Sequence, residues 1–344
     1  MADDLFERMD RLTQFLGYTP QRIVVFRALK LGDLLCTVPA FRALRRAFPN
    51  AHIALLSLNW AAEFVDLFPN YFDEFIAFPG WPGLPEQPVD PVRAVAFLAD
   101  MQARQWDVAI QMQGNGTFVN PMLSLFNARA LTGYFPQDQP QQRMGDSTLW
   151  MPYPERTHEV KRHVQLMTFL GLESTGYELE FPETLANNTI PPIIQALGQP
   201  FICLHAGGIS GRRWPESKFA EVADRLADTG FTIVLTGSLP EQSITQNVQQ
   251  HMHHSAIDLT GQTTLATLAA VLRQSALLVS NDTGVSHVAA ACHVPSVVIF
   301  TSADPAEWAP LNHQRHRVVR EADAIPEQVA NEALRLYQTV GQGA

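Results

Sequence analysis

The sequence predicts an α/β protein built of two doubly wound domains, and three observations indicate this fold class. Short apolar runs, of the kind that form strands buried on both faces, alternate with longer segments of helical periodicity. The alternation occurs twice, on either side of residues 183–199, where it lapses. The chain has 344 residues, 46% of them hydrophobic, which is enough for two domains with separate cores. Such alternation is typical of βαβ units that build a parallel sheet.

The chain begins with a segment, residues 3–16, that we expect to form an amphipathic helix with Asp3 as its N-cap. The apolar residues on one stripe of this helix are Leu5, Phe6, Met9, Leu12, Phe15 and Leu16. The helix belongs to an N-terminal extension, residues 1–21, that we expect to pack on the first domain. Contact with a second copy of the chain or with a membrane surface is the alternative interpretation.

The first domain is expected to span residues 22–185. Its strands are predicted at residues 23–26, 52–57, 74–78 and 108–112. Its helices are predicted at residues 34–48, 60–68, 91–104 and 156–170. The proline-rich residues 79–85 form a loop inside this domain, because they are too few for a domain linker.

The second domain is expected to span residues 196–325. Its strands are predicted at residues 201–205, 232–236, 277–280 and 296–300. Its helices are predicted at residues 216–228, 240–252, 264–274 and 284–292, and a last helix near residues 326–340 lies in a C-terminal segment of residues 326–344. Because open parallel sheets bind ligands at the carboxyl ends of their strands, we expect both domains to face a central cleft that holds the ligand.

Charge and composition limit the function. The formal net charge of −10 argues against a general nucleic-acid binder, which needs an excess of Lys and Arg. The three cysteines, Cys36, Cys203 and Cys292, lie in apolar runs, as buried reduced thiols do. No apolar run reaches the roughly 18 residues of a membrane span, and the acidic N-terminus lacks a signal-peptide pattern. We therefore expect a soluble cytoplasmic protein, with any membrane contact peripheral.

Residues 277–291 contain the strongest candidate site. An apolar strand leads through the polar turn of residues 280–284 into a helical run that begins at Val285. Such a turn directs free backbone N–H groups and the positive end of the helix dipole at one point, which suits a phosphate. Asp282 and His287 are placed to contact a ligand bound there. The alternative is an ordinary turn in which Asp282 or Thr283 only caps the helix.

A second candidate site follows the first strand. Gly32 permits a tight turn, and Asp33 then stands at the start of a helix. The Asp33 carboxylate is suited to accept a proton from a hydroxyl nucleophile, although capping of the helix accounts for most aspartates at such positions. The surrounding segment has a local basic excess, which indicates an anionic acceptor and comprises Arg22, Arg27, Lys30, Arg42, Arg45 and Arg46. A solvated helix face is the alternative for at least two of the last three.

The second domain opens with a glycine-rich loop. Gly207 and Gly208 let the backbone approach a ligand, and Arg212 and Arg213 can hold a diphosphate by charge-assisted hydrogen bonds. An exposed loop with two solvated arginines is the alternative. After the next strand, Glu241 is placed either to accept ribose hydroxyl groups or merely to favour the dipole of its own helix.

Other binding sites are only weakly indicated. The chain has neither G-x-G-x-x-G nor G-x-x-x-x-G-K-[ST], which weakens a nicotinamide or P-loop interpretation. His251, His253 and His254 have no carboxylate or Cys ligand at a supporting spacing. We interpret them as a polar helix end and expect no metal.

Several of these motifs together resemble those of glycosyltransferase family 9, the ADP-heptose:lipopolysaccharide heptosyltransferases and their relatives. The matching residues are Leu31-Gly32-Asp33, Gln113 to Gly116, Gly207 to Pro215, Leu235-Thr236-Gly237, Ser280 to His287 and Asp304-Pro305. The resemblance runs from about Arg22 to Arg320. It implies a GT-B fold with the acceptor on the first domain and the donor nucleotide on the second. It also implies an inverting, metal-independent transfer of heptose from ADP-heptose to a lipopolysaccharide-core or other cell-envelope glycan.

The resemblance also implies residue roles. Asp33 would be the general base on the acceptor hydroxyl, and Arg212 would neutralise the diphosphate leaving group where a lysine often stands in the family. Asp282 would bond donor-sugar hydroxyls, Glu241 would bond the ribose, and the phosphates would be held by the backbone of Thr283 and Gly284 with His287. We expect further donor contacts from Gly207, Gly208 and Arg213. We expect the acceptor to contact Arg27, Lys30 and Asn115.

Two alternatives stay open at this point. A GT-B sugar-nucleotide epimerase or hydrolase would turn over the donor without an acceptor. A non-catalytic nucleotide-sugar-binding protein would use Asp33 only as a helix cap, whose loss costs roughly 1 kcal/mol of stability.

Overall fold

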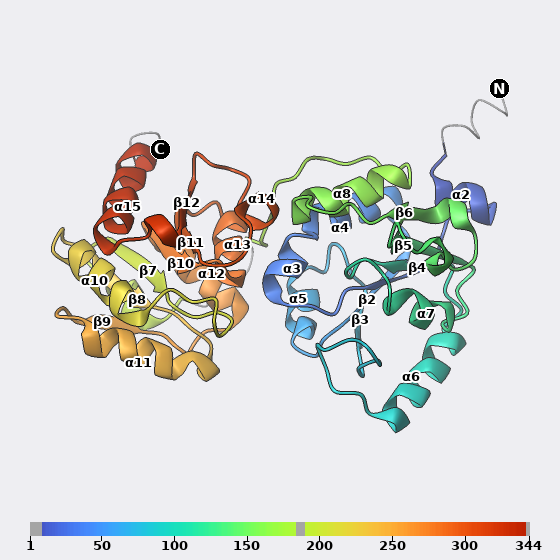
Figure 1. Cartoon of the computed structure of the whole chain (residues 1–344), viewed down its shortest axis with the longest axis horizontal. Helices are drawn as coiled ribbons and strands as arrows, with labels where there is room; N and C mark the ends of the chain where they lie inside the picture. The colour runs from blue at the N-terminus through green and yellow to red at the C-terminus, as the bar shows by residue number, and fades with distance from the viewer. Residues whose placement is uncertain (1–8, 184–189, 342–344) are drawn as a thin grey trace. The chain divides into compact units, whose positions relative to one another are not determined.

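The computed structural model describes residues 9–183 and 190–341, and it divides into two compact units between Tyr177 and Glu178. Each unit contains one six-stranded sheet with helices packed on both of its faces (Figure 1). Every pairing between neighbouring strands is parallel. These findings confirm the predicted α/β class with two doubly wound sheets.

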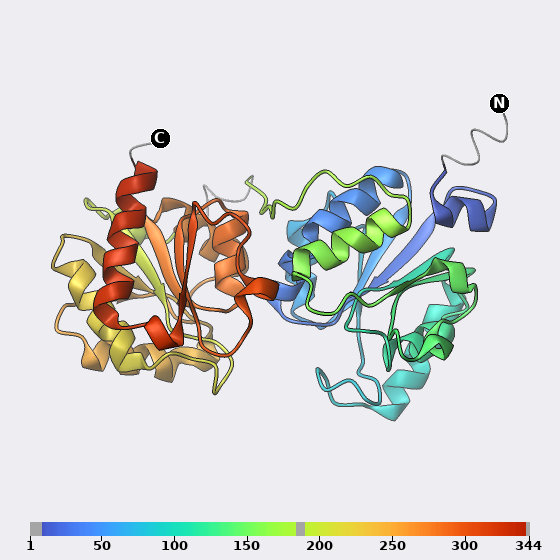
Figure 2. The same cartoon turned by 45° about the horizontal axis from the view of Figure 1, so that its top comes forward.

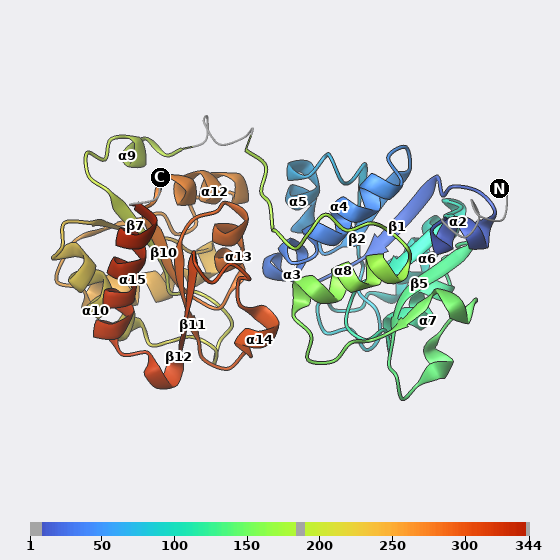
Figure 3. The same ribbon diagram turned by 90° about the horizontal axis from the view of Figure 1, so that it is seen from above.

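The N-terminal unit has the sheet order β3-β2-β1-β4-β5-β6. Its strands are β1 (Arg22–Phe26), β2 (His52–Ser57), β3 (Glu74–Ala77), β4 (Val108–Gln111), β5 (Ala130–Phe135) and β6 (Trp150–Pro152). Its helices are α2 (Arg11–Leu16), α3 (Leu31–Leu35), α4 (Val38–Ala47), α5 (Ala61–Leu67), α6 (Pro91–Ala103), α7 (Val119–Ser124) and α8 (Glu159–Phe169), with short 3-10 helices η1 (Pro140–Gln142) and η2 (Ser147–Leu149). Helices α4 and α8 pack side by side on one face of the sheet, and α6 lies on the other (Figures 2 and 3).

The C-terminal unit has the sheet order β12-β11-β10-β7-β8-β9. Its strands are β7 (Phe201–His205), β8 (Thr232–Leu235), β9 (Ala256–Asp258), β10 (Leu277–Asn281), β11 (Ser296–Phe300) and β12 (His316–Arg320). Its helices are α9 (Pro192–Gln195), α10 (Glu216–Ala227), α11 (Gln242–His251), α12 (Leu265–Gln274), α13 (Gly284–Ala291), α14 (Pro305–Trp308) and α15 (Pro326–Gly341), with 3-10 helices η3 (Leu239–Glu241) and η4 (Glu321–Asp323). Helix α10 packs between α11 and α15.

Numbered within its own unit, each sheet has the strand order 3-2-1-4-5-6 of a doubly wound nucleotide-binding fold. The order reverses between β1 and β4 in one unit, where Ile23 pairs with Val108. It reverses between β7 and β10 in the other, where Cys203 pairs with Leu278. Ligands of such sheets bind beyond the carboxyl ends of the strands at the reversal, so these two edges are the places to look for sites.

The central strands are buried on both faces, as their apolar runs predict. In the C-terminal unit, Ile202, Leu204 and Val279 pack with Trp214 and Phe219 in one core cluster. The three cysteines are free thiols and buried, as predicted. Burial raises the pKa of Cys203 to about 12, so this thiol stays protonated.

Two helices differ from the prediction. The helix predicted over residues 34–48 is divided into α3 and α4, because Pro39, in the first turn of α4, lacks the N–H that a continuous helix needs. The N-terminal helix covers only Arg11–Leu16 in the described part of the chain. Asp10 caps it by accepting a hydrogen bond from the Thr13 N–H at 2.9 Å, and Gly17 ends it with a φ of 75°. Residues 1–8, which include the proposed Asp3 cap, lie outside the described residues.

Helix α2 nevertheless packs on the N-terminal unit. Leu12 is buried, and the Arg11 N–H donates to the Leu170 carbonyl at 2.9 Å. Phe15, the stripe residue one turn further on, is 43% exposed.

Among the described residues, seven short helices and strands were absent from the prediction: α7, α9, α14, β5, β6, β9 and β12. Strand β5 contains Gly133, and β6 ends at Pro152, which hides the apolar pattern of a strand. Strands β9 and β12 are sheet edges with half-exposed residues, so their sequences mix polar and apolar residues. Within residues 9–183 and 190–341, no helix is both long and apolar enough to cross a membrane.

Candidate functional site

Asp33 lies beyond the carboxyl end of β1, in the first turn of α3. Its Oδ2 accepts a hydrogen bond from the Lys30 N–H at 3.2 Å, so the carboxylate caps this helix. The side chain still keeps 19% of its surface exposed. Capping and solvent access occur together, and the capping interpretation therefore does not exclude a chemical role.

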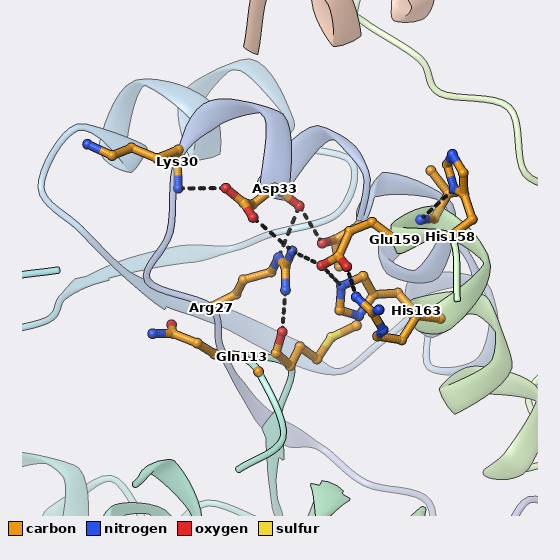
Figure 4. A network of polar contacts seen from close by, with 12 residues as sticks. Arg27, Lys30, Asp33, Gln113, His158, Glu159 and His163 are labelled. Atoms are coloured by element: carbon orange, nitrogen blue, oxygen red, sulfur yellow. Dashed lines mark hydrogen bonds and ion pairs between the residues drawn. The ribbon is translucent and has the colours of Figure 1, made fainter. Parts of the chain in front are cut away.

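Arg27 follows β1 directly and is 1% exposed. Its Nε donates to the Asp33 carbonyl at 3.0 Å, and its Nη2 lies 3.7 Å from Asp33 Oδ1. Its Nη1 donates to the Met112 carbonyl, and its Nη2 donates to Glu159 Oε1 at 2.7 Å (Figure 4). Every guanidinium nitrogen thus has a partner inside the protein, so the side chain predicted to meet an acceptor holds Asp33 in place instead of reaching into solvent.

Glu159 opens α8 and is the centre of a buried network. Its Oε1 accepts from Arg27 and lies 3.0 Å from His163 Nε2, and its Oε2 pairs with Arg162. An ionised carboxylate can only accept, so the His163 Nε2 carries the proton. We call Arg27, Asp33, Glu159, Arg162 and His163 the charge cluster. Its last three members stand in none of the motifs described above.

A buried tyrosine supports the charge cluster from β5. The Tyr134 hydroxyl donates to the Arg162 carbonyl at 2.9 Å and lies 3.1 Å from His163 Nδ1. Tyr134 is fully buried, and burial raises its pKa, so the hydroxyl stays protonated. The network therefore fixes the start of α8 against the sheet.

Burial and neighbouring charges set the protonation of the charge cluster. Burial raises the pKa of the Asp33 carboxyl, Arg27 partly offsets that rise, and the negative charge of Glu159 adds to it. Burial alone would also raise the pKa of Glu159, but the hydrogen bond from His163 and the charges around it hold that pKa well below its usual range. Burial, with help from Arg27, lowers the pKa of His163 to about 4, so the ring is neutral at pH 7. Asp33 is therefore the carboxylate of the cluster that takes up a proton more readily.

The other predicted acceptor residues lie in the loops that follow β1 and β4. The Lys30 side chain is exposed. Asn115 lies after β4, and its Oδ1 accepts from the Thr117 N–H and hydroxyl at 3.1 and 2.9 Å, which shapes the turn. Gln113 ties this loop to the one after β1, because its Oε1 accepts from the Ala28 N–H at 2.7 Å. These loops follow neighbouring strands at the reversal of strand order.

In the C-terminal unit, the predicted glycine loop is closed by Glu241. A Cβ on Gly207 would lie 2.2 Å from Glu241 Oε1, so a larger residue here would have to displace the Glu241 carboxylate. The Gly208 N–H donates to the same oxygen at 2.7 Å, and Glu241 Oε2 accepts from the Ser238 N–H at 2.8 Å. Burial favours the neutral acid, but His205 and these hydrogen bonds lower the pKa of Glu241 overall. The carboxylate predicted to meet a ribose thus also holds the loop.

Asn281, at the end of β10, is a further site residue to which the sequence assigned no role. It is completely buried. Its Nδ2 donates to the Ala206 and Gly207 carbonyls at 2.9 and 3.0 Å, and its Oδ1 accepts from the Trp214 N–H at 3.0 Å. One side chain therefore joins both ends of the glycine loop to the strand that precedes the Asp-Thr-Gly turn.

The turn of residues 282–284 leads into α13. Thr283 occupies the N-cap position, but its side chain makes no capping hydrogen bond, so the predicted capping alternative is wrong for Thr283. The Asp282 N–H donates to the Ile299 carbonyl at 2.9 Å, which holds the turn on β11. His287 is 2% exposed and packs edge-on to Trp308, with 6.4 Å between the ring centres. Asp282, Thr283 and Gly284 are half-buried, so these residues of the turn are more accessible than the His287 ring.

The glycine loop and the turn lie against each other. A Cβ on Gly208 would be 3.8 Å from both Arg213 Cγ and Thr283 Cβ. Arg212 is exposed and Arg213 half-buried, and neither guanidinium forms a hydrogen bond or ion pair with the described residues. Two unpaired cations thus flank a loop and a helix N-terminus rich in N–H donors, an arrangement suited to an anion.

The histidines at the end of α11 have structural partners. The backbone N–H groups of His253 and His254 donate to Asp224 at 2.9 Å, and His254 Nε2 lies 2.8 Å from Asp228 Oδ1. Across the described ranges, no three His, Cys, Asp or Glu residues are grouped in a way that could hold a metal.

The family model and the curated relatives agree on one family. The model of glycosyltransferase family 9 (heptosyltransferase) matches residues 95–338. Lipopolysaccharide heptosyltransferase 1 of Salmonella typhimurium is 24% identical over 304 residues, which cover 83% of this chain and 89% of that protein. Lipooligosaccharide heptosyltransferase 2 of Haemophilus ducreyi is 33% identical over 109 residues, which cover only 30% of this chain and 31% of that protein.

A solved structure extends the likeness to the fold. The ADP-heptose lps heptosyltransferase II of E. coli superposes with a TM-score of 0.74 at 20% sequence identity, and the match covers 94% of this chain and 100% of that one. This likeness confirms the predicted GT-B fold.

Proposed function

This chain belongs to glycosyltransferase family 9 and is a glycosyltransferase, and we propose that it moves a heptose from ADP-heptose to a lipopolysaccharide-core or other cell-envelope glycan. The proposal includes inversion at the sugar carbon and independence from metal ions. It assigns the acceptor to the N-terminal unit and the donor nucleotide to the C-terminal unit.

The observation that carries the proposal is the position of Asp33. Its carboxylate is partly exposed at the reversal of strand order, and the neighbouring Arg27 and Lys30 N–H fix its orientation. Burial raises its pKa, which makes it a better proton acceptor than an ordinary aspartate. A fixed and moderately basic carboxylate at a ligand-binding edge is what a hydroxyl nucleophile needs.

In the proposed reaction, the acceptor hydroxyl gives its proton to Asp33 as its oxygen attacks the anomeric carbon of the heptose. The bond from that carbon to the phosphate oxygen breaks, and ADP leaves with the electron pair. Attack from the face opposite the leaving group inverts the configuration. The charge that develops on the diphosphate is stabilised by Arg212, Arg213 and the N–H groups of Thr283 and Gly284. Asp282 and Glu241 take the donor-sugar and ribose hydroxyls.

The direct test supplies the purified protein with ADP-heptose and a lipopolysaccharide that lacks heptose, and detects the product by mass spectrometry. We expect Asp33→Asn to lower the transfer rate by about 10²-fold or more, the size of a general-base contribution, with the affinity for ADP unchanged. Asp90→Asn is the matched control, because Asp90 also caps a helix, α6, by accepting from Val92 and Arg93 N–H groups. Transfer by Asp33→Asn at the wild-type rate refutes the base assignment.

The same assay separates the alternatives. Release of ADP without acceptor identifies a hydrolase, and binding without turnover identifies a non-catalytic protein. A thermal-shift panel of ADP, UDP, GDP and CDP tests the nucleotide, since a ligand at 100 times its Kd stabilises the fold by about 2.7 kcal/mol. Transfer that survives excess EDTA supports metal independence, and transfer that EDTA abolishes and Mg²⁺ restores refutes it.

A further inference from the structure

The charge cluster places one cation between two carboxylates. The Arg27 Nη2 lies 2.7 Å from Glu159 Oε1 but 3.7 Å from Asp33 Oδ1. Arg27 is 1% exposed and the Glu159 side chain 6%, so solvent screens their interaction little. The Arg27 guanidinium is therefore bound more closely to Glu159, the more buried carboxylate, than to Asp33.

Without Glu159, the Arg27 guanidinium beside Asp33 would make Asp33 a weaker base. A single buried guanidinium beside a carboxylate stabilises its charged form and so disfavours proton uptake. With Glu159 present, the two guanidinium groups of Arg27 and Arg162 are balanced by two carboxylates, and the neutral His163 adds a hydrogen bond but no charge. The cluster as a whole is then uncharged when Asp33 is ionised.

We propose that Glu159 is a positioning residue for the transfer reaction, which holds the Arg27 guanidinium beside Asp33 and cancels enough of its charge for Asp33 to accept the acceptor's proton. This inference rests on the proposed role of Asp33. It adds a function for the start of α8, which no motif in the sequence analysis had included.

The charged and titratable groups around Asp33 and its partners come from four elements. Arg27 follows β1, while Glu159, Arg162 and His163 come from α8. Tyr134 lies behind them on β5, and Cys36 follows α3 itself. Tyr134 and His163 are neutral at pH 7, so the charges that act on Asp33 are those of Arg27, Glu159 and Arg162.

The test is the pH dependence of kcat, measured with ADP-heptose and heptose-free lipopolysaccharide. In Glu159→Gln, Arg27 acts on Asp33 without compensation. We therefore expect the acidic limb of the profile to move to lower pH, the plateau kcat to fall by roughly tenfold, and KM for ADP-heptose to stay unchanged. Glu159→Asp keeps the charge and should restore the wild-type limb.

Glu74→Gln is the matched control. Glu74 opens β3, an edge strand of the N-terminal sheet, and it pairs with Arg104 at 2.6 Å and His52 at 2.9 Å, so it has the same kinds of partner as Glu159. Its loss should leave the acidic limb in place. An unmoved limb in Glu159→Gln, or one that moves to higher pH, overturns the inference and leaves Glu159 a structural role only.

A second measurement does not depend on transfer. The titration of Asp33, followed by NMR of ¹³C-labelled aspartate and assigned with Asp33→Asn, should shift to lower pH in Glu159→Gln. If Glu159→Gln does not fold, Arg162→Gln is measured in its place. Its Asp33 titration should move to higher pH, because the negative charge of Glu159 is then less compensated and acts more strongly on Asp33. An unmoved titration overturns the inference. If the wild-type protein has no transfer activity, the proposed function is refuted. If transfer depends on Asp33 but its pH profile is unchanged in Glu159→Gln, only this inference is refuted.

Discussion

Asn281→Ala should destabilise the C-terminal unit and loosen the glycine loop. The substitution removes three hydrogen bonds, to the Ala206 and Gly207 carbonyls and from the Trp214 N–H. The site is completely buried, so water does not replace them. At about 1 kcal/mol for each hydrogen bond, the free energy of unfolding should fall by roughly 3 kcal/mol.

Urea unfolding measures this loss, and hydrogen–deuterium exchange of peptides from each unit shows which unit it affects. We expect faster exchange in residues 206–214 and no change in the N-terminal unit. The affinity for ADP, measured by titration calorimetry, should fall by roughly tenfold, because the loop must then be ordered on binding. Asn247→Ala is the control, since Asn247 is exposed on α11. A loss below about 0.5 kcal/mol, the usual size of a surface substitution, would refute the reasoning.

Two further predictions concern the C-terminal unit. Gly207→Ala should lower the affinity for ADP by tenfold or more, because the new Cβ would lie 2.2 Å from Glu241 Oε1 and would push this carboxylate off the Gly208 N–H that it holds. Gly198→Ala is the control, since a Cβ there has no neighbour within 4 Å, and it should bind ADP normally. Equal affinities of the two variants would contradict the packing argument. Stability should fall as pH is lowered from about 6.5 towards 4, because burial lowers the pKa of His316 to about 4 and the unfolded chain binds a proton that the folded chain does not. His316→Gln should reduce that slope in thermal melts at several pH values; an unchanged slope would exclude His316 as a source.

The sequence predicted the strands that apolar runs define and missed those that they do not. Strands β2, β7 and β11 begin and end where predicted, since each has an apolar interior with a polar residue at one or both ends. Edge strands β9 and β12 are half-exposed, so neither apolar run nor alternation marks them. Pro39 was available in the sequence as a sign that the helix after Asp33 divides, and it could have been used.

The candidate site was only partly readable for a different reason. Asp33, Gly207 and Glu241 stand in local motifs, so their chemistry is visible along the chain. Five strands, β2 to β6, separate Glu159 from Arg27 in the sequence, so no local pattern indicates that these two residues pair. Asn281 lay inside the motif that was identified, but its role depends on carbonyls that precede it in sequence by more than one whole βα unit. Burial of charged residues depends on the whole fold, so the periodicity of α8 does not predict that Glu159 and Arg162 are buried.

The reversed strand order also has a consequence for how the chain is made. In each sheet, the first strand has a partner on both sides only after the fourth strand has been synthesised. Ile23 pairs with Val108 in one sheet, and Cys203 pairs with Leu278 in the other. During synthesis on the ribosome, β1 therefore lacks its β4 partner until β4 has been made. The edge of β1 that β4 will cover is exposed to other chains during that interval. The same delay recurs for β7, which lacks its β10 partner until β10 has been made. Synthesis of this protein therefore passes twice through a stage at which a chaperone can bind an exposed strand edge.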